Sequence, residues 1–251
     1  MKRNTKAKRI FLAGASGAIG RRLSRLLVED GHAVTGTTRT PSKAAALAAL
    51  GVNPVVVDVF DAESLRSVLA EAHPDIVIHQ LTDLPPGLDS KLMADARIRN
   101  VRLRDVGTAN LVAAAVAAGV TRIIAQSIAF AYAPGSMPYD EAAPLNVGST
   151  DAASVLSARA VASLERQVME GPFVGVVLRY GKLYGPGTGF DVPPTGGPVH
   201  VDAAADAARR ATACGGPGIY NVAEEDGAVS SAKAKAVLGW DPLFRIEPET
   251  V

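Results

Sequence analysis

The chain has 251 residues, of which 26 are Lys or Arg and 25 are Asp or Glu, so its formal net charge is +1. Hydrophobic residues make up 48% of the chain and charged residues 20%, which excludes a disordered composition and supplies ample material for a core. Near-neutral charge and 5% aromatic residues argue against nucleic-acid and acidic-membrane partners, and a single cysteine excludes a disulfide framework. We therefore expect a soluble, cytoplasmic α/β protein.

The basic N-terminus, Met1–Arg9, is predicted to be a solvated leader rather than a signal peptide, because the apolar run after it breaks at Gly14. From there, short apolar runs alternate with amphipathic stretches. The runs predicted as buried strands are Arg9–Ala13, Ala33–Thr38, Asn53–Val57, Ile76–His79, Arg122–Gln126 and Gly175–Arg179. The first stretch predicted as a helix begins near Ile19, and three more cover Ala62–Ala72, Lys91–Ala118 and Ala152–Met169. This alternation predicts a Rossmann-type, doubly wound parallel sheet with helices on both faces.

The pattern changes after Gly185, where the chain becomes dense in Gly and Pro and is predicted to form a loop. A helix over His200–Thr212, a strand over Ile219–Val222 and a helix followed by a turn over Ser230–Pro242 are expected beyond it. This part is too small for a core of its own. We therefore predict a Rossmann domain over residues 1–185 and a small C-terminal cap over residues 186–251, with the strand near 219–222 belonging to either.

A glycine-rich segment follows the first predicted strand and opens the first predicted helix. Its residues are Gly14, Ala15, Ser16, Gly17, Ala18, Ile19 and Gly20. In this position Gly14 permits a tight turn, Gly17 lets the backbone approach a pyrophosphate, and Gly20 allows the helix to pack closely on the strand. The amide groups and dipole of the helix N-terminus favour phosphate. The segment therefore predicts a dinucleotide site, although a tight turn without a ligand remains the alternative.

The end of the second predicted strand bears on the choice of cofactor. NAD sites usually carry Asp or Glu there for the ribose hydroxyls, whereas this chain has Thr37, Thr38, Arg39 and Thr40. A guanidinium at Arg39 suits a 2′-phosphate, with Arg22 and Lys43 as helpers, so the sequence favours NADP over NAD. Asp58 and Val59, after the third strand, are placed near the adenine, unless Asp58 only completes a turn.

Nine segments in this order resemble the extended short-chain dehydrogenase/reductase superfamily, in its NAD-dependent epimerase/dehydratase branch. They are GASGAIG, VVVDVFD, IVIHQLT, GTANLVAAA, AQSIAFAY, LRYGKLYGPGTG, HVDAAA, YNVAEE and SAKAKAVLGWDP. The resemblance covers nearly the whole chain. It implies a Rossmann domain with a C-terminal substrate-binding region and an active site between them. It also implies that Leu81 and Thr82 line the cofactor cleft and that Tyr184 lies near the nicotinamide and substrate.

The chain departs from the family at the residues that transfer protons, since the family uses a Y-x-x-x-K pair with a Ser or Thr. Four positions after Tyr132, Tyr139, Tyr180, Tyr184 and Tyr220 stand Ser136, Ala143, Tyr184, Thr188 and Glu224, so no such pair exists. Aligned through Glu165, the family's tyrosine and lysine positions are Ser157 and Val161. The usual hydroxyl position falls on Ile128, and Ser127 is offset from it by one residue.

Three explanations remain open for this departure. Another residue serves as the acid or base, with Tyr184, Lys182, Ser127 and Tyr132 as candidates; or the reaction is a hydride transfer that needs little proton help; or the cofactor is bound without turnover. Lys182, where members often carry an asparagine that contacts substrate, either binds an anionic or carbonyl group or lies in solvent. The resemblance thus implies an NAD(P)-dependent oxidoreductase or epimerase/dehydratase-like enzyme for a small carbonyl or sugar-derived substrate. The alternative is a catalytically silent NADP-binding sensor or regulatory protein.

Three further expectations concern ligands and partners. The four histidines, His32, His73, His79 and His200, show no ligand spacing, so no metal site is predicted. The resemblance implies a homodimer formed through the helices at 91–118 and 152–169. Two junctions, Gly187 to His200 and Asn221 to Ser231, are short for the family, so the substrate region is either trimmed or interrupted there.

Overall fold

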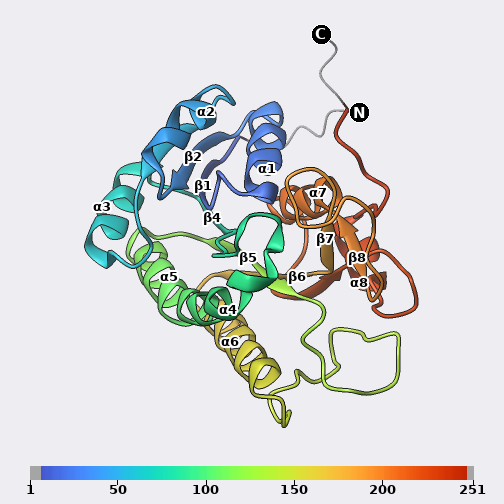
Figure 1. Cartoon of the computed structure of the whole chain (residues 1–251). Helices are drawn as coiled ribbons and strands as arrows, with labels where there is room; N and C mark the ends of the chain where they lie inside the picture. Colours follow the sequence, from blue (N-terminus) through green and yellow to red (C-terminus); the bar gives the residue numbers. More distant parts are fainter. Residues whose placement is uncertain (1–6, 248–251) are drawn as a thin grey trace.

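Seven parallel strands form the central sheet of the computed structural model, which describes residues 7–247 (Figure 1). Their order across the sheet is β3-β2-β1-β4-β5-β6-β9. The strands are β1 (Arg9–Ala13), β2 (Ala33–Thr38), β3 (Asn53–Val56), β4 (Ile76–His79), β5 (Arg122–Ile128), β6 (Val174–Tyr180) and β9 (Gly218–Val222). The order reverses between β1 and β4, and ligands of open α/β sheets bind in the crevice beyond the carboxyl ends of strands at such a point.

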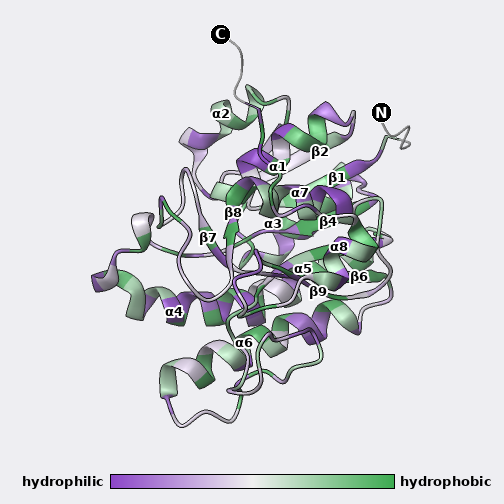
Figure 2. Ribbon diagram, turned by 90° about the vertical axis from the view of Figure 1, so that its right-hand side faces the viewer, coloured by the Kyte–Doolittle hydropathy of each residue, from purple (hydrophilic) through white to green (hydrophobic). Residues whose placement is uncertain are grey.

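Helices cover both faces of the sheet, as predicted. The first face carries α1 (Ala18–Glu29), α2 (Ala44–Ala48), α7 (Val201–Ala211) and α8 (Ala232–Leu238), and the second carries α3 (Ala62–Ala72), α5 (Thr108–Ala117) and α6 (Ala152–Met169). Successive residues of β1 serve the two cores, because Ile10 and Leu12 pack with α1 whereas Phe11 and Ala13 pack with α3 and α5. In Figure 2 the ribbon of α6 alternates between hydrophobic and hydrophilic segments, as expected for a helix with one buried face.

The long helix predicted over 91–118 is a continuous helical segment with a local irregularity. It starts as a 3₁₀ turn at Ser90–Leu92, continues as α4 (Met93–Arg102), widens into a π turn over Leu103–Gly107, and resumes as α5. Such π turns often mark functional sites, since they change which side chains face a neighbouring cavity. The helix therefore places residues on the cavity side that its plain 3.6-residue periodicity does not indicate.

The strand predicted near 219–222 belongs to the main sheet as β9, parallel to β6. A separate parallel pair lies outside the main sheet and consists of β7 (Lys182–Tyr184) and β8 (Pro198–His200). Helix α7 packs against α1, so part of the C-terminal region completes the Rossmann layers. A substrate-binding role for residues 186–251 stays a prediction.

Most of the basic leader, residues 1–6, lies outside the described residues. Among residues 7–247, no helix combines the length and apolar character that crossing a membrane requires. Within the same range, no three His, Cys, Asp or Glu side chains are grouped as metal ligands.

Candidate active site

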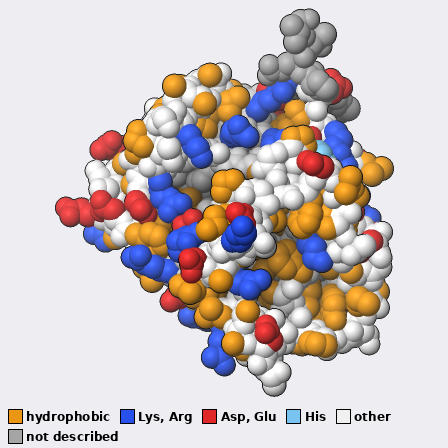
Figure 3. Space-filling view, in the orientation of Figure 1, with side chains coloured by type: hydrophobic (Ala, Val, Ile, Leu, Met, Phe, Trp, Pro, Cys, Tyr) orange, Lys and Arg blue, Asp and Glu red, His pale blue; other side chains and the backbone are white. Residues whose placement is uncertain are grey.

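A cavity of about 690 Å³ opens at the carboxyl ends of the central strands. Its lining comes from the glycine-rich turn after β1, the ends of β2, β4, β5 and β6, helix α4 with its π turn, and the loop after β7. Figure 3 shows a hollow near the middle of the molecule with Lys and Arg side chains around it. The cavity lies at the topological switch point, where ligand binding is expected.

The glycine-rich turn forms one wall of this cavity. Gly14 has a φ of +89°, which permits the tight turn after β1, and a Cβ at Gly20 would overlap the Gly14 carbonyl oxygen. Gly17 is the N-cap of α1 and provides no side-chain acceptor, and the first turn contains no acidic residue. The amide groups of that turn are therefore available to an anion at the positive end of the helix. Lining residues from the turn are Gly14, Ser16, Gly17, Ala18, Ile19 and Gly20.

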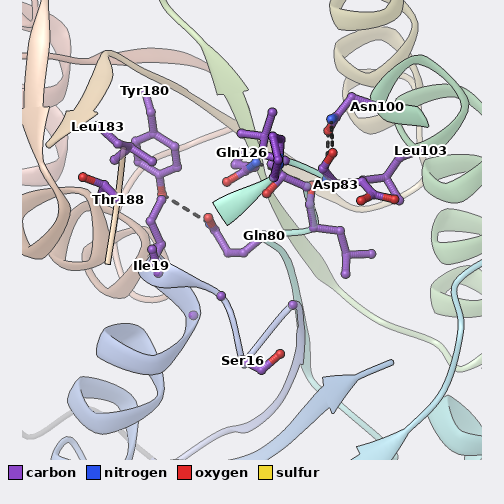
Figure 4. Close-up of a pocket in the computed structure, with 18 of the residues that line it drawn as sticks. Ser16, Ile19, Gln80, Asp83, Asn100, Leu103, Gln126, Tyr180, Leu183 and Thr188 are labelled. Atoms are coloured by element: carbon purple, nitrogen blue, oxygen red, sulfur yellow. Dashed lines mark hydrogen bonds between the residues drawn. The ribbon is translucent and has the colours of Figure 1, made fainter. Parts of the chain in front are cut away.

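The rim beside β2 carries Arg39 and Lys43, both lining the cavity. Arg39 is half exposed, and its Nη1 lies 3.3 Å from Oδ2 of Asp83, which also lies 3.4 Å from Nε of Arg99. Figure 4 shows how Asp83 is anchored, because its backbone amide donates to Oδ1 of Asn100 at 3.0 Å. The proposed cationic rim therefore exists, but an aspartate already contacts its main guanidinium.

Two of the residues expected around the cofactor lie away from the cavity. Arg22 donates from Nε to Asp202 at 2.6 Å, which turns it toward α7. Asp58 is exposed and accepts the backbone amide of Phe60 at 2.9 Å, so its carboxylate serves the turn after β3. The other expected residues, Val59, Leu81 and Thr82, line the cavity.

A tyrosine–glutamine pair lies at the inner end of the cavity. Nε2 of Gln80 donates to the Tyr180 hydroxyl at 3.2 Å (Figure 4). Burial raises the pKa of Tyr180, so this phenol keeps its proton at neutral pH. Oε1 of Gln80 is buried and has no hydrogen-bond partner among the described residues, so the cavity contains an unused polar acceptor. These observations and the open glycine turn fit a dinucleotide with a polar head group.

A buried ion pair organises the ends of β5 and β6. Arg179 donates to both carboxylate oxygens of Glu165, at 2.8 Å and 2.7 Å, and Ser127 donates to Glu165 at 2.7 Å. The Tyr132 hydroxyl accepts from Arg179 at 3.0 Å and donates to Asn221 at 2.6 Å. Burial raises the pKa of Tyr132. Ser127 lines the cavity but its hydroxyl is engaged by Glu165, and Tyr132 is outside the cavity lining.

The remaining catalytic candidates are also engaged elsewhere. The Tyr184 hydroxyl donates to Glu224 at 2.9 Å and accepts from Arg245 at 3.0 Å, and this side chain is outside the cavity lining. Lys182 lines the cavity, yet its Nζ donates to the carbonyl oxygen of Thr195 at 2.7 Å. The tyrosine expected near the nicotinamide thus packs in the C-terminal part of the chain.

The positions that the resemblance aligns with the family's tyrosine and lysine both fall on α6. Ser157 lines the cavity from α6, and Val161, one turn later, is fully buried beneath it. Glu165, one further turn along, holds the Arg179 ion pair. Of the two aligned positions, one therefore presents a short hydroxyl side chain to the cavity, and the other holds an aliphatic side chain that does not reach it.

Arg104 lines the cavity, and His79 is buried at the end of β4 outside the lining. Arg104 is half-buried in the π turn and lines the cavity; burial lowers the pKa of its guanidinium, and the negative charge of Glu165 opposes this effect. His79 is buried, accepts the Leu81 amide on Nδ1 at 3.2 Å, and donates from Nε2 to Thr108 at 3.1 Å. Burial, together with the Arg104 charge, lowers the pKa of His79 to about 4, so the ring is neutral.

The cavity lining includes polar residues that the sequence did not assign to the site, among them Gln80, Arg104, Gln126 and Tyr180. Gln80 directly follows a predicted strand, which is a usable signal because ligands bind at strand ends. Tyr180 ends β6, and its place at a strand end is a signal of the same kind. Arg104 gave no signal, since nothing in the local pattern indicates a π turn.

Comparisons with known proteins agree with this geometry. The profile of a family described as NAD(P)H-binding matches residues 14–165. A 3-diazoavenalumate denitrifying reductase from a Streptomyces species is 45% identical over 183 residues, which cover 72% of this chain and 58% of the relative. This chain therefore spans less than two thirds of that protein's length.

Solved structures show the same fold at low sequence identity. The UDP-glucose 4-epimerase of Thermotoga maritima, determined with UDP-glucose, has a TM-score of 0.77 and 17% identity, with 94% of each chain covered. The enzyme WbmG of Bordetella bronchiseptica, in complex with NAD and UDP, has a TM-score of 0.75 and 16% identity over 96% of this chain and 91% of WbmG. The predicted Rossmann-type architecture is confirmed.

Proposed function

Because the chain belongs to the NAD(P)H-binding family, we propose that it is a nicotinamide-dependent reductase whose substrate accepts a hydride without a proton from an enzyme tyrosine. One observation carries this proposal. The glycine turn and cleft for the cofactor are intact, whereas Ser157 and Val161 stand at the positions of the family's tyrosine and lysine. The cofactor, when bound, supplies two electrons and a hydrogen as hydride, and the protein supplies position and electrostatics.

NADPH is the proposed form of the cofactor. No carboxylate follows β2 directly, and the cationic side chains of Arg39 and Lys43 line that rim of the cavity. A guanidinium can pair with a 2′-phosphate through two parallel hydrogen bonds. Asp83, 3.3 Å from Arg39, contacts this guanidinium in the ligand-free protein and would have to release it to the phosphate.

The lack of a strong proton donor in the cavity narrows the substrate class. Tyr132 and Tyr184 lie outside the cavity, the Ser127 hydroxyl is bonded to Glu165, and burial raises the pKa of the Tyr180 phenol, which makes it a weaker acid. Reduction of a ketone needs a proton on the new alkoxide, which an active-site acid normally provides. A substrate that needs no such proton fits this cavity better than the carbonyl or sugar substrate expected from the resemblance.

An arenediazonium ion satisfies this requirement, and the Streptomyces relative is named as a denitrifying reductase of a diazo compound. Gain of one hydride and loss of dinitrogen converts the arenediazonium cation to the arene. The two electrons of the hydride form the new C–H bond, the C–N electrons leave with N₂, and no proton enters from the protein. We therefore propose a diazo or similarly electrophilic small molecule as the substrate.

The remaining expectations are retained as proposals. Helices α4 and α6 pack on each other within one chain, and the side chains of Ile98 and Leu156 on these helices are exposed. These exposed apolar side chains support the homodimer that the resemblance implies. A cytoplasmic location stays a prediction, as does the lack of a metal.

Binding titrations test the cofactor. We expect NADPH to bind at least tenfold more tightly than NADH, and Arg39→Ala to remove most of that preference while leaving NADH affinity unchanged. Arg66→Ala, an exposed arginine of α3, is the matched control and should leave both affinities unchanged. Equal binding of the two nucleotides would contradict the role of Arg39.

Turnover is tested by following NADPH absorbance with a diazotised aminobenzoate and, separately, with a panel of aldehydes and ketones. We expect enzyme-dependent oxidation with the diazonium compound above the rate of an enzyme-free mixture. If NADPH binds tightly and none of these compounds oxidises it faster than the enzyme-free mixture, the protein is the silent cofactor-binding alternative and the reductase proposal fails.

A further inference from the structure

We propose that Arg104 is the specificity-determining residue of this site and that it binds a carboxylate of the substrate inside the cavity. This inference rests on the proposed reductase function and adds the substrate class to it. It identifies a residue that sequence patterns did not reveal.

The π turn places Arg104 in the cavity wall. Neighbouring arginines of the same helical segment have other contacts: Arg102 lies 4.2 Å from the centre of the Phe60 ring, and Arg99 pairs with Asp83 at the rim. Arg104 alone among these three lies in the π turn and lines the cavity while half-buried. An extra residue in a helical turn is a common way to direct a side chain into a site.

The guanidinium of Arg104 has no direct hydrogen-bond or ion-pair partner within residues 7–247. The nearby carboxylate of Glu165 already accepts two bonds from Arg179 and one from Ser127. His79, whose pKa is lowered by burial and by this charge, is neutral. Because a guanidinium does not lose its proton in proteins, a half-buried positive charge remains available to an anion.

The cofactor phosphates do not account for this charge. The glycine turn and the N-terminus of α1 lie on one face of the sheet, whereas the π turn packs with α6 on the other face. In Figure 4, Leu103, the neighbour of Arg104, lies across the cavity from Ser16 and Ile19. Arg104 instead shares its side of the cavity with Ser157 of α6, the position aligned with the family's tyrosine, because the π turn packs on α6 and both residues line the cavity. That end is where substrate meets the nicotinamide in the proposed function.

A carboxylate matches what surrounds Arg104. The planar guanidinium fork pairs with the two oxygens of a carboxylate, and one guanidinium balances its single charge. The cavity as a whole is cationic, since five cationic side chains line it against the single carboxylate of Asp83. The five are Arg39, Lys43, Arg97, Arg104 and Lys182. An anionic substrate is therefore attracted to the cleft and then oriented by Arg104.

Calorimetric titration of the protein saturated with NADP⁺ tests this directly, because the oxidised cofactor prevents turnover. The probes are 4-hydroxycinnamate and its methyl ester, which differ in the charged group. We expect wild type to bind the acid, Arg104→Gln to bind it roughly 10- to 100-fold more weakly, and Arg104→Lys to bind it with intermediate affinity. Binding of the ester and of NADP⁺ should be unchanged in these variants. Arg102→Gln is the matched control and should bind like wild type.

A second readout is the thermal stability of the ligand-free protein. Arg104→Gln removes a half-buried charge that has no hydrogen-bonded partner and is expected to be at least as stable as wild type, whereas the acid should stabilise only wild type. If acid and ester bind with equal affinity, or if Arg104→Gln binds the acid like wild type, the inference is overturned. Failure of NADP⁺ to bind would instead overturn the proposed function, so the two failures are distinguishable.

Discussion

His79 makes the stability of this protein depend on pH in a range where most carboxylates do not titrate. The ring is fully buried at the end of β4, with both nitrogens used by neutral partners. A folded-state pKa of about 4, against 6.5 in the unfolded chain, makes protonation of the folded protein cost about 3 kcal/mol. The contribution of the neutral His79 ring to the stability of the fold is fully present above pH 6.5 and is lost as pH falls toward 4.

The expected change in the free energy of unfolding follows from the folded and unfolded pKa values of His79. At about pH 5 most unfolded chains carry a proton on this ring and few folded chains do. The free energy of unfolding is therefore about 2 kcal/mol lower than at about pH 8. Urea unfolding at the two pH values measures it. His79→Gln, which cannot titrate, should lose about 2 kcal/mol less than wild type between them.

The control is His73→Asn, since His73 is exposed and has a φ of +44° that asparagine tolerates. It should retain the full pH dependence of wild type. Carboxylates that titrate at lower pH contribute equally to all three proteins and cancel. If wild type and His79→Gln lost the same stability between the two pH values, the assignment of a neutral, desolvated His79 would be refuted.

Three further changes have definite expected outcomes. Glu165→Gln leaves the buried Arg179 without its anion and should destabilise the fold by about 3–5 kcal/mol in urea unfolding, while a loss under 1 kcal/mol would show that the pair is dispensable. Gly20→Ala forces a methyl group against the Gly14 carbonyl oxygen, so we expect about 1–3 kcal/mol of destabilisation and at least tenfold weaker NADPH binding; unchanged affinity would contradict the close packing. Asp83→Asn frees the guanidinium at the β2 rim and should strengthen NADPH binding by roughly threefold or more with little effect on NADH, whereas weaker NADPH binding would reverse the role given to this aspartate.

The periodicity of apolar residues along the sequence predicted the strands and helices whose bounds depend on nearby residues alone. The strands at 33–38 and 76–79 and the helix at 62–72 have the predicted bounds. The strand predicted over Arg122–Gln126 continues to Ile128, since Ser127 is satisfied by Glu165 from α6. Its polar side chain is buried only because of that distant partner, which the local sequence does not show.

The candidate site likewise contains residues that the local sequence predicts and residues that depend on distant contacts. The glycine turn follows from strand, turn and helix signals within one short segment, and the structure places it in the cavity wall. Tyr180 and Gln80 meet across a separation of 100 residues, and Arg104 depends on a π turn. Tyr132 and Tyr184 could be identified as tyrosines near the family's motifs, yet their hydroxyls are bonded to Asn221 and Glu224, so only the three-dimensional arrangement removes them from the cavity.

The most direct test of hydride transfer without a protein proton donor is the single-turnover rate of NADPH oxidation as a function of pH. A diazotised aminobenzoate is mixed with the NADPH complex between about pH 6 and about pH 8, and the enzyme-free rate is subtracted. The absence of a Tyr–Lys pair predicts substrate-dependent oxidation at a rate that stays constant across this range. Bound NADPH that is not oxidised, or a rate that follows the titration of one acidic group, would contradict it.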